Sequence, residues 1–136
     1  MKMYTTKDQF HTLLSPLYFF MQSSRTAYVK YSANKIFLHA QAIRLANRKV
    51  YRLLTENTSY IPEELQADIL LLLNHYDIWF TQFKKHKKKL KPSLGDEFVF
   101  NQLDDQSAFP KAVEEKIFKY YEQLKQEIAS ETLLEQ

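Results

Sequence analysis

One decapeptide, FKKHKKKLKP from Phe83 to Pro92, concentrates the residues best suited to bind a polyanion. It contains six lysines and one histidine. Lysine ammonium groups neutralise phosphates and release condensed counterions, which gives an affinity that falls with salt and is independent of sequence. The predicted helix pairing brings further cationic residues to the same end of the molecule. The candidate polyanion-binding residues are Lys84, Lys85, Lys87, Lys88, Lys89, Lys91, Lys30, Lys35 and Arg25.

The lysine run also has two purely structural explanations. Cationic side chains in the last turn of a helix interact favourably with the helix dipole and keep that end soluble. Residues 1–92 carry 15 basic and 6 acidic side chains, whereas residues 93–136 carry 4 and 10, so the acidic part can fold against the basic part. The acidic residues that follow the run are Asp96, Glu97, Asp104 and Asp105. The sequence leaves open which of these groups the lysines face.

Nucleic acid is the polyanion that the neighbouring aromatic residues favour. Tyr28 and Tyr31 lie near the predicted cationic end, where their rings could stack on unpaired bases. The lysine run itself contains no arginine, the residue that recognises phosphate with two parallel hydrogen bonds. Sequence-independent binding is therefore the form of recognition that we expect here.

Two further groups of polar residues predict sites with less support. His39 is predicted to face Trp79 and Tyr76 across an apolar seam, where polar side chains could line a buried pocket. A histidine in that position is equally explained as a hydrogen-bonded core residue. A stripe of arginines could hold an acidic partner, although glutamates lie within reach along the chain. The stripe comprises Arg44, Arg48 and Arg52.

No catalytic, metal or cofactor site is predicted. In NHYDIW, from Asn74 to Trp79, helical geometry spreads the functional groups over different faces, so they cannot form a triad. The chain has no glycine-rich phosphate loop, no histidine-glutamate metal motif and no nucleophile elbow. It also has no cysteine, which excludes thiolate ligands and cysteine catalysis. These observations favour a protein that is not an enzyme.

Few, long elements must position these residues. Only one glycine and four prolines occur in 136 residues, a length typical of a single domain, 1–136. The spacing of apolar residues predicts an all-α bundle of three or four long antiparallel helices, with one longer loop before the C-terminal helix. The predicted helical stretches are 6–57, 62–91 and 110–130, and the first of them is expected to kink or break at Pro16 or near Ser23.

A short turn near Ser59 predicts a helical hairpin in which residue i lies opposite roughly residue 118 − i. Phe83, His86 and Leu90 then continue one packed stripe, so the lysines surround the end of a packed helix. EFVF, from Glu97 to Phe100, is predicted to be a short extended piece that packs on the bundle.

No targeting segment or membrane span is predicted. The N-terminal MKMYTTKDQF lacks the apolar core of a signal peptide. The longest aliphatic run, Ile69 to Leu73, is far too short to cross a bilayer. A cytoplasmic protein without a membrane partner is expected.

The leading functional hypothesis is a helical interaction module that binds a protein partner or a second copy of itself. It rests on the wide apolar surface of the long helices, which needs cover if Phe37, Leu38, Leu45 and Tyr51 are not buried within the chain. The alternative hypothesis is that the lysine run and its neighbours bind nucleic acid or another polyanion.

Overall fold

The computed structural model describes residues 4–99 and 109–135, and helices dominate this part of the chain. The all-α prediction is confirmed, because the described residues form no β-strand and only one isolated bridge, between Ile36 and Glu97. The long helices are α2 (Ser15–Ala33), α3 (Phe37–Glu56), α4 (Gln66–Leu90) and α5 (Lys111–Glu135). The short elements are α1 (Thr6–Gln9), the π-helical turn η1 (Phe10–Leu14), and the 3-10 turns η2 (Thr58–Tyr60) and η3 (Glu63–Leu65).

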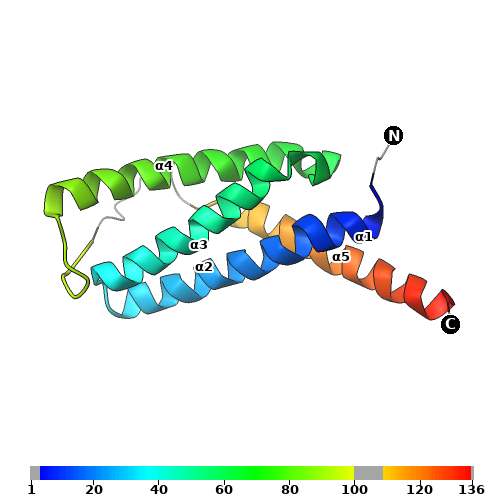
Figure 1. Cartoon of the computed structure of the whole chain (residues 1–136), viewed down its shortest axis with the longest axis horizontal. Coiled ribbons are helices and arrows are strands. Elements are labelled where there is room, and N and C mark those ends of the chain that lie inside the picture. Colours follow the sequence, from blue (N-terminus) through cyan, green and yellow to red (C-terminus); the bar gives the residue numbers. More distant parts are fainter. Residues whose placement is uncertain (1–3, 100–108, 136) are drawn as a thin grey trace.

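Figure 1 shows α2, α3 and α4 running along the length of the molecule in alternating directions, with α3 packed between the other two. α5 crosses them diagonally and contacts η1, α2 and α4. The C-terminal half of α5 projects beyond the other helices, and most of its described side chains are exposed. Every helix in the described ranges is too short or too polar to cross a membrane.

The first helical stretch breaks fully at Asn34–Ile36, a position that was not predicted. The expected irregularity at Pro16 is present, because α2 begins at Ser15 with Pro16 in its first turn, whereas α2 runs through Ser23 without interruption. A wider π-helical turn precedes Pro16, and the Ser15 amide donates to the carbonyl of Phe10, so the turn accommodates the proline ring. Neither glycine nor proline marks the real break, and the residues that hold it come from a distant segment.

The start of α3 is capped by the chain that follows α4. The amide of Phe37 donates to the carbonyl of Asp96 at 2.8 Å, and the amide of Leu38 donates to the carbonyl of Leu94 at 2.8 Å. These bonds satisfy two of the amides that every helix start leaves without an intrahelical partner. α3 therefore folds back along α2, and what the sequence suggested as one long helix is a hairpin of two.

The predicted pairing of α3 with α4 holds at one end only. The rings of Phe37 and Phe83 lie 6.0 Å apart. Phe83 is within two residues of the partner that the predicted offset assigns to Phe37. Nearer the connection between α3 and α4, the ring of Tyr51 lies 5.9 Å from that of Phe80. The predicted offset assigns Tyr51 a partner much earlier in α4. The offset assumed one tight turn, whereas two 3-10 turns join the helices.

Two hydrophobic clusters form the core. The larger cluster joins η1, α2, α3, α4 and α5, and it includes fully buried residues such as Leu17, Leu72 and Ile117. The smaller cluster lies between the end of α2, the start of α3 and the C-terminal half of α4. It includes one residue from the segment after α4. Its members are Ala27, Tyr31, Phe37, Ala40, Ile43, Trp79, Phe83 and Phe98.

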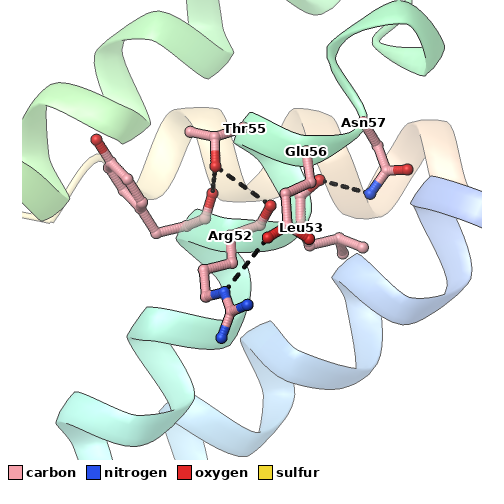
Figure 2. A network of polar contacts seen from close by, with 6 residues as sticks. Arg52, Leu53, Thr55, Glu56 and Asn57 are labelled. Carbon is pink, nitrogen blue, oxygen red and sulfur yellow. Dashed lines mark hydrogen bonds and ion pairs between the residues drawn. The ribbon is translucent and has the colours of Figure 1, made fainter.

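Side chains of the last turns close the C-terminal end of α3 (Figure 2). Thr55 Oγ1 donates to the carbonyl of Arg52 at 3.2 Å, and Asn57 Nδ2 donates to the carbonyl of Leu53 at 2.9 Å. The second bond occupies the Leu53 carbonyl, one of the last four of the helix, which lack an intrahelical donor. The ion pair between Arg52 and Glu56, 3.4 Å long, confirms the pairing that their spacing predicted. Both side chains are exposed, so the pair adds little to stability.

Candidate functional site

Eight of the nine predicted cationic residues gather at one end of the molecule. They lie on the last two turns of α4, just beyond its end, and around the connection between α2 and α3, at the left in Figure 1. All eight side chains are exposed. We refer to this surface as the lysine-rich end. It consists of Lys30, Lys35, Lys84, Lys85, Lys87, Lys88, Lys89 and Lys91.

The chain turns sharply where α4 stops. Lys91 has left-handed backbone angles, with φ 45° and ψ 56°, and its amide donates to the carbonyl of Lys87 at 2.9 Å. This left-handed conformation raises the conformational free energy of a residue with a Cβ atom by about 1–2 kcal/mol. Pro92 follows and prevents the helix from continuing. The chain is thereby directed from α4 towards the start of α3.

The described part of the acidic segment does not neutralise the lysines. The Asp96 carboxylate accepts a hydrogen bond from the amide of Ser93 at 2.7 Å, and Glu97 forms the isolated bridge with Ile36. None of the eight lysines forms an ion pair with a carboxylate of the described residues. Asp104 and Asp105, which were also predicted to cover the lysines, lie outside the described residues.

Phe98 ties together the elements that carry the lysines. Its side chain is fully buried, and its ring lies 5.1 Å from Phe37 and 5.3 Å from Phe83. The Tyr31 hydroxyl donates to the carbonyl of Phe98 at 2.6 Å. The centre of the His86 ring lies 6.4 Å from that of the Phe98 ring. The predicted packing of the segment after α4 is confirmed for Phe98. Because α2, α3 and α4 all contact this residue, the two groups of lysines are held in fixed relative positions.

Only one of the two tyrosines proposed for base stacking is accessible. Tyr31 is buried and uses its hydroxyl to bind the Phe98 carbonyl, so its ring cannot receive a base. Tyr28 is exposed, and its ring lies 6.5 Å from that of Tyr31.

The prediction that Leu90 packs with Phe83 and His86 is wrong. Phe83 is buried and His86 is half-buried, but Leu90 is exposed. Phe98 packs against Phe83 and His86 in its place. Leu94 is exposed as well. Its exposure could have been predicted, because a position between a proline and the only glycine of the sequence is typical of a loop tip.

Arg25 does not belong to the lysine-rich end. It forms an ion pair with Glu114 of α5, and its guanidinium lies 5.4 Å from the centre of the Phe118 ring. The predicted location assumed one continuous helix opposite α4, whereas α5 in fact crosses α2 at this point. Glu114 is buried, so Arg25 supplies the counter-charge that a buried carboxylate requires.

The residues of the predicted polar pocket are placed in the core or at its edge. Tyr76 and Trp79 are buried in different clusters, and His39 is half-buried on α3. Trp79 stacks on Phe83 with 5.3 Å between ring centres, and burial raises the pKa of the Tyr76 hydroxyl above its usual value. Two open hollows of the described surface lie elsewhere, beside Tyr60 and on the distal half of α5.

The other polar residues near the core have structural roles. Asn47 is buried on α3, and its side-chain oxygen accepts a hydrogen bond from Ser24 of α2 at 2.5 Å. Asp68 of α4 pairs with Lys116 of α5 at 3.3 Å. Within the described ranges, no group of three histidine or acidic side chains could hold a metal ion.

Similarity to known proteins does not identify the site. No protein-family model, curated protein or solved structure matches the chain. The lysine-rich end must therefore be judged by its own chemistry, which is that of a dense, rigidly held and exposed positive surface.

Proposed function

We propose that the protein is a non-enzymatic binding module whose lysine-rich end binds a phosphate-bearing polyanion. The observation that carries this proposal is the convergence of eight exposed lysines, none of them paired with a carboxylate of the described residues. Like charges held close together repel one another. A polyanion relieves this repulsion and releases its own condensed counterions, and both effects favour binding.

Self-association through apolar helix faces, the leading hypothesis from the sequence, has less support. Phe37 is buried, and Tyr51 packs against Phe80, so the chain itself covers part of the surface that was expected to need a partner. Leu38 and Leu45 remain exposed on one face of α3. Two leucines are a small basis for an interface compared with the eight lysines.

Charge reversal tests the proposed function. Replacing Lys84, Lys85, Lys87 and Lys88 with glutamate should abolish binding to a labelled single-stranded oligonucleotide and to heparin, measured by fluorescence anisotropy. For the unmodified protein, four phosphate contacts would give log K a slope of about −3 against log salt. Circular dichroism should show unchanged helicity, because all four side chains are exposed.

A matched control reverses four exposed lysines elsewhere. The control residues are Lys7, Lys111, Lys119 and Lys125. This variant has the same net charge as the first but should keep most of the affinity. Equal losses in the two variants would assign binding to overall charge and not to the lysine-rich end. Absence of binding to either polyanion at low ionic strength would contradict the proposed function.

A further inference from the structure

The lysine-rich end also exposes apolar side chains. Leu38, Leu90 and Leu94 are 48%, 49% and 55% exposed, and Tyr28 and Val29 are exposed on the last turns of α2. These five make up half of the large apolar side chains that are exposed in the described part of the chain. Half of this exposed apolar surface thus lies on the same part of the molecule as the eight lysines.

The exposed leucines and the lysines lie at the same end of the molecule. Leu94 lies at the tip of the turn after α4, and its carbonyl accepts the amide of Leu38 at 2.8 Å. Leu90 lies in the last turn of α4, between Lys89 and Lys91. The backbone of this turn is fixed by its bonds to α3, so the leucines are held outwards together with the charges.

Exposed aliphatic side chains distinguish between polyanions. Single-stranded nucleic acid is bound mainly through phosphate contacts and through aromatic rings that stack on its bases, so aliphatic side chains contribute less there than in hydrocarbon. An anionic lipid surface offers negatively charged headgroups directly above hydrocarbon, which matches lysines interspersed with leucines. Long lysine side chains can reach the headgroup layer while their neighbours enter the acyl boundary.

We infer that the polyanion is an anionic membrane surface, which the protein contacts end-on through Leu90, Leu94, Leu38 and the surrounding lysines. This inference rests on the proposed function and names its partner. The absence of a membrane partner was expected because the sequence has no segment long enough to span a bilayer. A protein that contacts the membrane surface needs no spanning segment. Membrane association requires two signals when each alone is weak, and this end supplies charge and apolar surface together.

Vesicle sedimentation tests the inference. The full chain should pellet with phosphatidylcholine vesicles that contain about a quarter phosphatidylserine, a composition that attracts basic segments, and should stay in solution with pure phosphatidylcholine. Leu90→Ser combined with Leu94→Ser should weaken vesicle binding by about tenfold or more, because the apolar contribution is lost. The same variant should keep its affinity for heparin, because no lysine is changed.

Leu70→Ser with Leu71→Ser is the matched control, since these two leucines are exposed near the opposite end of α4. This control should bind vesicles like the unmodified protein. A salt series on the unmodified protein is independent of any variant: heparin binding should vanish at high salt, while vesicle binding should persist in part, because apolar contacts are not screened.

The outcomes separate this inference from the proposed function. If the chain binds heparin or an oligonucleotide but not anionic vesicles, or if the Leu90 and Leu94 substitutions leave vesicle binding unchanged, the membrane inference is wrong and the polyanion proposal stands. Tighter binding to an oligonucleotide than to vesicles would assign the surface to nucleic acid. Failure to bind any of the three probes at low salt would overturn both.

Discussion

At the scale of single residues, the ion pair between Arg25 and Glu114 shows how tertiary contacts reassign a charge. Arg25 was predicted to join the cationic surface because the helix pairing placed it opposite the lysine run. In the folded protein it is committed to a buried carboxylate 89 residues away. Its contact with Phe118 adds a cation–π interaction on the same helix. The pair therefore attaches α5 to α2 and leaves the lysines as the only cations of the candidate site.

Glu114→Gln should destabilise the protein by about 1–2 kcal/mol, since it removes the charge that Arg25 faces while keeping the shape of the side chain. The exposed neighbour Glu115 provides the control, because Glu115→Gln makes the same chemical change without this partner. Urea unfolding followed by circular dichroism measures both free energies of unfolding. Equal effects of the two substitutions would show that the ion pair contributes nothing specific.

At the scale of elements, the segment 93–98 determines where the first helical stretch breaks. Its carbonyls cap the start of α3, and Phe98 occupies the space between α2, α3 and α4. The two hydrogen bonds that cap the start of α3 contribute modestly. The buried ring is the larger part of this anchoring, at about 2–3 kcal/mol. The segment thus both shapes the hairpin and holds the lysine-rich end together.

Phe98→Ala should cost about 3–5 kcal/mol, because it leaves a cavity among packed aromatic rings. Phe19→Ala, at an exposed position of α2, should change stability by less than about 0.5 kcal/mol. Hydrogen exchange provides a local measurement: the amides of Phe37 and Leu38 should lose protection in the Phe98 variant, since they bond to the same segment. Unchanged protection there would contradict the proposed role of the segment.

At the scale of the whole molecule, charge and apolar surface are distributed unevenly. Positive charge concentrates at the end where α4 stops, whereas α5 carries acidic residues along its length. The larger core cluster lies away from the lysine-rich end, and the smaller cluster lies directly beneath it. The lysine-rich end therefore lies over a small core of its own, apart from the larger cluster.

We expect the isolated protein to be a monomer at micromolar concentration. Stable dimers bury about 1,200 Å² or more, and the exposed leucines of α3 offer only a small part of such an area. Multi-angle light scattering at physiological salt measures the mass directly. A dimer that Leu45→Glu converts to a monomer would contradict this expectation and restore self-association through α3.

Several features of the fold and the site could be predicted from the sequence. The helical content, and the start of the helical stretch 62–91 at Pro62 and its end at the lysines, were predicted correctly to within a few residues. Eight of the nine predicted cationic residues do share one end of the molecule. These features depend on local spacing and on proline, and both can be read within one or two turns of helix.

Other features depend on contacts between residues far apart in the chain. The amino-acid sequence by itself determined that the chain is helical and that its lysines end a helix. Only the tertiary structure decided the break at Asn34–Ile36, the partner of Arg25 and the exposure of Leu90. Tyr31 and Phe98, which meet beneath the lysines, are 67 residues apart. No local pattern encodes such a meeting, because the packing of distant side chains decides which apolar residues are buried and which are left to bind something else.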